Sequence, residues 1–230
     1  MFKLHYLKHY FNPNEYPKNE WYRQHAERNF DMLILGDAAA KRITPTNIPG
    51  KILNFSLPHQ SLVLDFEVLR QTFSILKPGG TAWFVLNAHA CCCGWGKADL
   101  RPYYWLFWPY HIAKNPFQLF YIRVAKRLPM IMLRPRDIYR IIKGVTDEDL
   151  FKSETQRAKR EWARLTTDER HIAVAKSSSL IREIIAFCKE REITPRFTFL
   201  SGLFADEAPT LYALKEACTG YIMDQADNTR

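Results

Sequence analysis

The stretch Asp31-Met-Leu-Ile-Leu-Gly36 is a short apolar run that stops at a glycine. An uninterrupted apolar run of this length is typical of a parallel strand that is buried on both faces. Further strands are predicted where short runs are rich in apolar, aromatic or β-branched residues. These runs are 52–55, 81–86, 196–200 and 220–223. The chain is therefore predicted to build a sheet around residues 31–36.

Segments with helical spacing separate these strands. Apolar residues recur at that spacing from Leu62 to Leu76, and Gly79-Gly80 predicts the C-terminus of this helix. Further helices are expected over 153–165, 180–188 and 207–217. Strands that alternate with helices predict an α/β protein. We expect a three-layer, flavodoxin-like sandwich, with helices on both faces of a parallel sheet.

The whole chain, residues 1–230, is predicted as a single α/β domain, because its length suffices for one well-buried core. Residues 101–165 break the alternation of strands and helices. They are dense in aromatic residues and are divided by several prolines, so they predict a mostly helical insertion.

The net charge of +9 is concentrated in this segment, since residues 101–164 hold 14 Lys or Arg against 6 Asp or Glu. A basic segment of this kind would attract an anionic partner. The aromatic residues within 103–136 would suit an anionic or acylated glycan, or a membrane surface. Nucleic acid is not expected, because no RNA-binding signature accompanies them. The alternative is a solvated basic face over an aromatic core, without any partner.

Several features predict a cytoplasmic protein. The first residues, Met1 to Phe11, contain no apolar stretch typical of a signal peptide, and no run in the chain is long and apolar enough to span a membrane. The five cysteines are odd in number and three are adjacent, which is a poor disulfide framework. Attachment to the inner face of the membrane would agree with the basic aromatic segment.

A metal site and a cofactor are not expected. His89 and the run Cys91-Cys92-Cys93 have side chains that zinc accepts. However, three adjacent cysteines cannot all point inward, and a free cysteine beside a strand is usually a small buried hydrophobe.

Three stretches are predicted to meet at one edge of the sheet: Gly36-Asp37-Ala38, residues 87–93 and Ser201-Gly202. Each directly follows a predicted strand, and ligands of parallel sheets bind beyond the carboxyl ends of the strands. Judged by its residues alone, the stretch after Gly36 is an ordinary strand-to-helix turn with Asp37 as the helix N-cap.

The stretch Gly36-Asp-Ala-Ala-Ala-Lys41 resembles the first block of the SGNH/GDSL hydrolase superfamily, which normally has Gly-Asp-Ser. Asn54-Phe-Ser-Leu-Pro-His-Gln-Ser61 resembles the second block, and Asn87 is similar in place to the asparagine of the third. The similarity is nearest to members associated with bacterial capsules and polysaccharides. It covers residues 25–90 and, more weakly, 175–205.

This resemblance implies a site at which Ala38 occupies the place of the nucleophilic serine, beside Asp37, and the Asn87 side chain helps to hold an oxyanion. The second block would also supply a backbone N–H to the oxyanion, but Pro58 has none to donate. The residues expected around the substrate are Gly36, Asn54, His59, Gln60, His89 and Ser201.

The expected function is that of an SGNH-like esterase or O-acyltransferase acting on bacterial surface polysaccharide, inactive as written. Alanine cannot attack an ester, and no His follows His171 to supply the superfamily's C-terminal Asp-x-x-His. The natural absence of these groups and an engineered change in a trimmed protein would both give this sequence.

Three alternatives stay open. The first is a non-catalytic binding or scaffold protein of a glycan-assembly system. The second is an S-adenosylmethionine-dependent methyltransferase, which residues 76–86 resemble, although the loop after residue 35 has only one glycine. The third is a Ser56 or Ser61 nucleophile with His59, against which a local structural loop is favoured.

Overall fold

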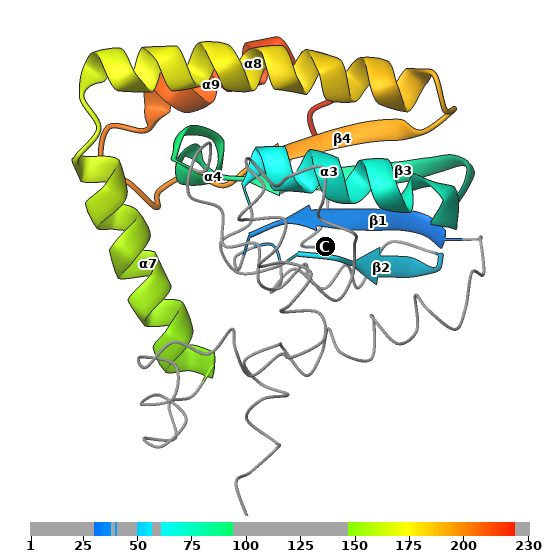
Figure 1. Cartoon of the computed structure of the whole chain (residues 1–230), viewed down its shortest axis with the longest axis horizontal. Coiled ribbons are helices and arrows are strands. Elements are labelled where there is room, and N and C mark those ends of the chain that lie inside the picture. Colours follow the sequence, from blue (N-terminus) through cyan, green and yellow to red (C-terminus); the bar gives the residue numbers. More distant parts are fainter. Residues whose placement is uncertain (1–29, 38–39, 41–49, 57–60, 94–146, 224–230) are drawn as a thin grey trace, which may run out of the picture. The chain divides into compact units, whose positions relative to one another are not determined.

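The structure, a computed structural model, describes residues 30–37, 40, 50–56, 61–93 and 147–223 (Figure 1). The chain divides into two compact units. One comprises residues 27–98 and 151–230 and holds the sheet. The other comprises residues 1–26 and 99–150, of which the structure describes only 147–150. Most of the predicted insertion, residues 101–165, thus lies outside the described residues and stays a prediction.

The described strands form one parallel sheet, as predicted. They are β1 (Phe30–Gly36), β2 (Ile52–Asn54), β3 (Leu76–Leu86) and β4 (Thr194–Phe199), and their order across the sheet is β2-β1-β3-β4. Beyond β4, Ile222 forms a single parallel bridge with Phe197. The strand predicted over 220–223 is therefore reduced to one bridge.

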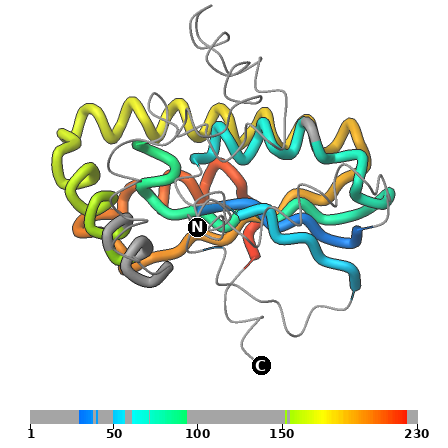
Figure 2. The backbone as a smooth tube through the Cα atoms, turned by 60° about the horizontal axis from the view of Figure 1, so that its bottom comes forward, coloured from blue at the N-terminus to red at the C-terminus, as the bar shows by residue number. Residues whose placement is uncertain are grey.

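Helices lie between the strands, also as predicted. They are α3 (Leu62–Thr72), α4 (Ala88–Cys92), α7 (Asp147–Ala163), α8 (Thr167–Lys189) and α9 (Ala208–Ala217). Helices α3 and α8 lie side by side over one face of the sheet (Figures 1 and 2). An ion pair between Arg70 and Glu183 and an edge-to-face contact between Phe66 and Phe187 join them. None of the described helices is long and apolar enough to cross a membrane.

Side chains are buried on both faces of the sheet, which explains why β1 is apolar from Met32 to Leu35. On one face, Phe84 of β3 stacks on Phe197 of β4 with ring centroids 5.1 Å apart. On the opposite face, Met32 and Ile34 form a buried cluster with Trp83, Val85 and Ala40.

The prediction that Gly79-Gly80 ends the first described helix is wrong. Helix α3 ends at Thr72, a 3-10 turn (η2, Phe73–Ile75) follows, and β3 begins at Leu76. Pro78 disfavours a helical backbone at the residue before it, so the chain turns to an extended form. The Gly79 N–H donates to the carbonyl of Glu192 at 2.8 Å, so this stretch packs against the turn after α8.

Candidate functional site

The ends of the four strands lie along one edge of the sheet, here called the carboxyl edge. Gly36, the last residue of β1, pairs with Val85, and Leu86, the last of β3, pairs with Phe199, the last of β4. Parallel pairing therefore brings the residues that follow each strand to one edge. Asp37, Asn87 and Ser201 come after β1, β3 and β4 at this edge, as the sequence predicts.

At Gly36 the backbones of β1 and β3 lie close together. A Cβ added there would lie 2.3 Å from the carbonyl oxygen of Val85 and 2.7 Å from Cβ of Ala40. The residue also has φ of +144°, which side chains rarely allow. Glycine thus lets β1 and β3 stay paired up to their ends, where Asp37 follows.

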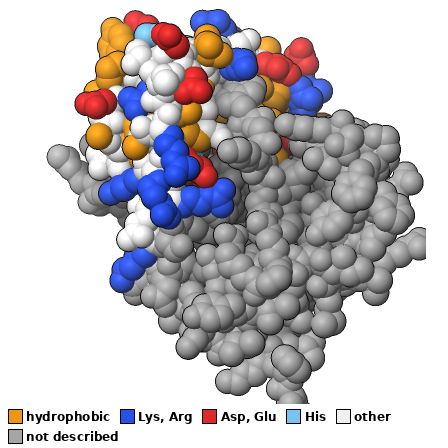
Figure 3. Space-filling view, turned by 60° about the vertical axis from the view of Figure 1, so that its left-hand side comes forward, with side chains coloured by type: hydrophobic (Ala, Val, Ile, Leu, Met, Phe, Trp, Pro, Cys, Tyr) orange, Lys and Arg blue, Asp and Glu red, His pale blue; other side chains and the backbone are white. Residues whose placement is uncertain are grey.

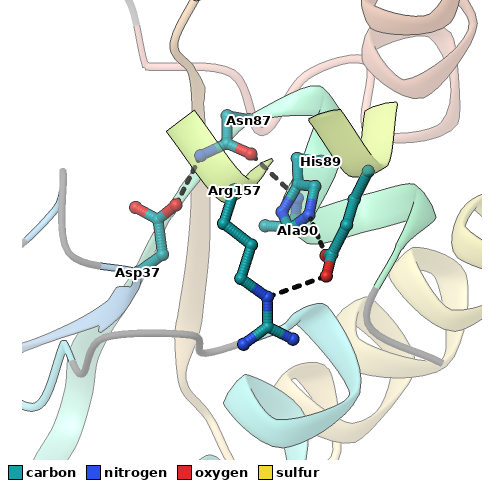
Figure 4. A network of polar contacts seen from close by, with 6 residues as sticks. Asp37, Asn87, His89, Ala90 and Arg157 are labelled. Atoms are coloured by element: carbon teal, nitrogen blue, oxygen red, sulfur yellow. Dashed lines mark hydrogen bonds and ion pairs between the residues drawn. The ribbon is translucent and has the colours of Figure 1, made fainter. Parts of the chain in front are cut away.

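Both polar atoms of the Asn87 side-chain amide form hydrogen bonds. Its Nδ2 donates to Oδ2 of Asp37 at 2.5 Å, and its Oδ1 accepts from the backbone N–H of Ala90 at 2.8 Å (Figure 4). The second contact caps α4, and Asn87 is only 3% exposed. The amide is therefore fixed in one orientation, although its Nδ2 has a second hydrogen to donate.

His89, in the first turn of α4, faces a carboxylate from α7. Its Nε2 lies 3.0 Å from Oε2 of Glu161, and Nε of Arg157 donates to Oε1 of the same carboxylate at 2.8 Å (Figure 4). Since a carboxylate only accepts, Nε2 carries the proton. Arg157 and Glu161, spaced by one helical turn, thus present an oriented acceptor to His89.

Two opposing effects set the protonation of Glu161. Burial raises its pKa, while the hydrogen bonds from Arg157 and His89 lower it. The lowering prevails, so the pKa of Glu161 lies below the ordinary glutamate value. Glu161 is therefore an ionised carboxylate at neutral pH.

Aromatic side chains support this pair from the loop before α9. The Phe204 ring is stacked against the His89 ring with centroids 5.9 Å apart, and it also contacts Trp162 of α7 at 5.7 Å. Nε1 of Trp162 donates to the carbonyl of Ala205 at 2.7 Å. The guanidinium of Arg170 covers the Trp162 ring at 4.5 Å. These contacts tie α7 and the loop together around His89.

The adjacent cysteines are buried thiols. Burial raises the pKa of Cys92 and of Cys93 to about 12, and it raises that of Cys91 strongly. The Cys91 carbonyl accepts from Oγ of Ser177 at 2.5 Å. Within the described residues, no group of three or more His, Cys, Asp or Glu side chains could hold a metal ion.

The remaining predicted residues are placed as follows. Asn54 Nδ2 donates to the carbonyl of Ala40 at 3.3 Å, while its Oδ1 accepts from Ser56 N at 2.9 Å. The Asn54 side chain thus makes hydrogen bonds with the backbone of nearby residues. Ser201 is exposed, and within the described residues no hydrogen bond joins it to Asn87. Ala38, His59 and Gln60 lie outside the described residues.

Two buried hydroxyls flank the second predicted block. Ser56 and Ser61 are 1% and 3% exposed, and within the described part of the chain neither Oγ has a hydrogen-bond partner. The structure does not describe residues 57–60 between them. A nucleophile made of Ser56 or Ser61 with His59 stays an alternative.

Sequence reasoning missed the contribution of α7 to this edge. The spacing of Arg157 and Glu161 indicates an exposed ion pair within a polar helix. No local pattern, however, connects residue 161 with residue 89. Phe204 carries no sequence signal for this role either, because its neighbours across the fold, His89 and Trp162, are distant in sequence.

The exposed side of α7 is rich in basic side chains. Figure 3 brings this side of the molecule forward and shows Lys and Arg gathered on its described part. The exposed basic residues of α7 and of the turn after it are Lys152, Arg157, Lys159, Arg160 and Arg164. They concentrate positive charge on this side of α7.

No family model, curated protein or solved structure matches this chain.

Proposed function

We propose that this protein is an SGNH-like, flavodoxin-like α/β scaffold that binds an acylated bacterial surface glycan at the carboxyl edge. In this form it does not turn the ester over, because Ala38 stands where the superfamily has serine. The observation that carries the proposal is the Asn87 amide, which Asp37 and the N-terminus of α4 hold at the ends of β1 and β3.

The order of the strands supports the flavodoxin-like assignment. With the bridge at Ile222 counted as a fifth position beside β4, the order follows the 2-1-3-4-5 pattern of flavodoxin-like sheets. In such sheets the ligand lies beyond the carboxyl ends of the strands. Asp37 and Asn87 occupy that position.

The chemistry of the edge fits an ester carbonyl. The second hydrogen of Asn87 Nδ2 could donate to the oxygen of a carbonyl or of an oxyanion. A serine at position 38, next to Asp37 in the chain, would supply the hydroxyl that attacks such a carbonyl. Alanine lacks that hydroxyl, so the expected activity of the protein as written is binding, and the basic side of α7 would favour an anionic glycan.

Binding is tested by thermal denaturation with an O-acetylated acidic oligosaccharide and with the same oligosaccharide after alkaline de-O-acetylation. A ligand that binds only the folded state raises the melting temperature. We expect a rise with the acetylated form alone, and a smaller rise for Asn87→Ser, which keeps a helix N-cap residue but loses the amide donor. Equal shifts with both oligosaccharides, or no shift with either, would contradict the proposal.

Ester chemistry is tested by the hydrolysis of an aryl acetate. We expect measurable turnover by Ala38→Ser and none by the protein as written. Turnover by the Ala38 protein would show that the edge uses a different nucleophile. The binding assay, repeated with S-adenosylmethionine, tests the methyltransferase alternative, which predicts a rise in melting temperature with that cofactor.

A further inference from the structure

The basic side of α7 forms a surface that begins at the carboxyl edge. It consists of the exposed residues Lys152, Arg157, Lys159, Arg160 and Arg164, here called the basic face. We infer that the basic face binds the chain of an acidic glycan, which extends from the carboxyl edge along α7 and carries an oxyanion, a carboxylate or a phosphodiester, in each repeat. The inference rests on the proposed function, because it assigns the glycan of that function to a chemical class.

The opposite side of α7 fixes the direction in which the basic face points. Trp162 is 2% exposed, and its Nε1 donates to the carbonyl of Ala205 at 2.7 Å. Arg160 follows Arg157 by three residues and Arg164 follows Arg160 by four, a spacing that puts side chains on the same side of a helix. Because Trp162 faces inward, these guanidinium groups lie on the solvent side, where Figure 3 shows Lys and Arg gathered.

Little negative charge offsets the basic face. Among the side chains of α7 that the structure describes, at 152 and 155–163, Glu161 is the one acid, and Arg157 and His89 already bind it. Within the described part of the chain, no ion pair engages Lys159, Arg160 and Arg164. These three cations are therefore available to an external anion. A guanidinium can bind a carboxylate or a phosphate through two parallel hydrogen bonds.

Arg157 connects the basic face with the carboxyl edge. Its Nε donates to Glu161 at 2.8 Å, and the same carboxylate lies 3.0 Å from Nε2 of His89, which follows Asn87 by two positions (Figure 4). Among the described residues, no other hydrogen bond engages this guanidinium, so its two terminal nitrogens can donate to an anion. A glycan bound at Asn87 can thus continue past Arg157 and along α7.

The spacing of the cations requires an extended ligand. Lys152 and Arg160 are about 12 Å apart along the helix axis, at a rise of about 1.5 Å per residue. A single charged sugar cannot contact both of them, whereas a chain of several repeats can. Binding should therefore strengthen with chain length, and salt should weaken it, because salt screens exposed charges.

The residues between the cations favour a glycan over other polyanions. Gln156, which is exposed on the same side, has a side-chain amide that can hydrogen-bond to sugar hydroxyls. In the described part of the chain, the exposed large hydrophobic side chains are Ile172 of α8 and Tyr212 of α9, and none belongs to α7. Single-stranded nucleic acid stacks its bases on aromatic side chains, and a helix that lies on a membrane presents an apolar side. The basic face offers neither feature.

The experiment compares the affinities of a short and a long acidic oligosaccharide, each before and after alkaline de-O-acetylation, by isothermal titration calorimetry. In the original protein we expect the long chain to bind about tenfold more tightly than the short one, as three exposed ion pairs of ordinary strength would give. Separate series with a polyuronate and with a phosphodiester-linked glycan distinguish the two oxyanions, because the preferred one shows the larger effect of length.

Two triple variants show whether this effect belongs to α7. Replacement of Lys159, Arg160 and Arg164 by Gln should remove most of the effect of length and leave the affinity for the short chain unchanged. The matched control replaces Lys176, Arg182 and Lys215 by Gln, which removes the same charge from exposed positions on α8 and α9 and should preserve the effect. A longer chain also offers more places to bind, but this statistical gain is equal in all three proteins.

The outcomes separate the inference from the proposed function. Equal affinities for the short and long chains, equal effects of length in the two triple variants, or an effect of length that about 1 M salt leaves intact would overturn the inference. An oligodeoxythymidylate of equal charge that binds as tightly as the long glycan would overturn the assignment to a glycan. Affinities that do not depend on O-acetylation contradict the proposed function alone. An effect of length that only the α7 variant loses supports the inference.

Discussion

At the scale of single residues, Gly36 links the sheet to the candidate site. It pairs with Val85 at the end of β1 and directly precedes Asp37, which holds Asn87. The backbone of β3 leaves no space for a side chain at this position. A change at Gly36 would therefore disturb strand pairing and the orientation of the Asn87 amide together.

Gly36→Ala is expected to destabilise the protein strongly. An unfavourable φ alone costs about 1–3 kcal/mol, and the overlap of Cβ with the Val85 carbonyl adds to this cost. Urea denaturation measures the free energy of unfolding. Gly220→Ala is the matched control, because Gly220 has φ of +86° but no atom within 4 Å of the added Cβ. Equal losses in the two variants would contradict the role of the close approach.

Individual residues also show how far the site was predictable. Asp37 and Asn87 could be placed at one edge because each directly follows a predicted strand, and the ends of parallel strands meet. Glu161 could not be placed, since its partner His89 belongs to another element and is far away in sequence. Tertiary packing alone decides that contact.

At the scale of the elements, the start of α8 is fixed by a capping box. Oγ1 of Thr166 accepts from the Glu169 backbone N–H at 3.2 Å, and the Glu169 carboxylate accepts from Thr166 N at 2.8 Å. These contacts satisfy backbone donors that a helix N-terminus leaves open.

Thr166→Ala is expected to lower the free energy of unfolding by about 0.5–2 kcal/mol, because it removes the N-cap acceptor. Thr166→Ser, which keeps the hydroxyl, is the control and should stay close to the original protein. Equilibrium urea denaturation at neutral pH measures the free energy of unfolding of both variants. Equal stability of the alanine and serine variants would show that the capping box does not contribute.

The same capping box should make the free energy of unfolding depend on pH. Hydrogen bonds from the backbone N–H and the hydroxyl of Thr166 lower the pKa of Glu169 below the ordinary glutamate value. The stabilisation is therefore complete above about pH 4.5 and is lost as the pH falls through the lower pKa of the folded state. The stability difference between the protein and Glu169→Gln should shrink over this range. A difference that stays constant down to pH 2 would contradict this linkage.

The elements themselves were predictable where one pattern prevails. Apolar runs located β1 and β4, and apolar residues at helical spacing located α3 and the second half of α8. The end of α3 was misplaced because two adjacent glycines resemble a helix C-cap, whereas Pro78 and the pairing of Leu76 with Phe30 extend the chain before it reaches them. The helix α4 was missed, since it is too short to show a period.

At the scale of the whole molecule, the five cysteines show how far thiol side chains are shielded from solvent. None of the five forms a disulfide; Cys91, Cys92, Cys188 and Cys218 are buried, and Cys93 is partly buried. Burial raises the pKa of Cys92, Cys93, Cys188 and Cys218 to about 12. Since the thiolate is the reactive form, native thiols should react slowly.

We expect a thiol-specific aromatic disulfide to label the native protein much more slowly than the urea-unfolded protein at pH 8, because burial raises the pKa of the thiols and so lowers the fraction of reactive thiolate. All five cysteines should react once the chain unfolds. Cys93→Ser is the control, because removal of the least buried thiol should slow any residual native labelling. Rapid labelling of two or more thiols in the native protein would contradict the burial described.

The parallel arrangement of the described strands was predictable, because strands and helices that alternate along the chain leave few arrangements other than a parallel sheet. The division of the chain into two units was not, since composition marks residues 101–165 as different without showing how they pack. The bridge at Ile222 shows the same limit: the residue pattern predicts a strand over 220–223, but not which strand it pairs with or how much of it pairs.

The order of the strands has a consequence for the way the protein is made. β1, β2 and β3 lie within residues 30–86, whereas β4 joins β3 only after residues 87–193 have been synthesised. Contacts between distant segments form late, because a long loop must close first. On the ribosome, the contact between Asp37 and Asn87 can therefore form before Glu161 has been translated. The nascent chain can thus orient the Asn87 amide before it contains the carboxylate that contacts His89.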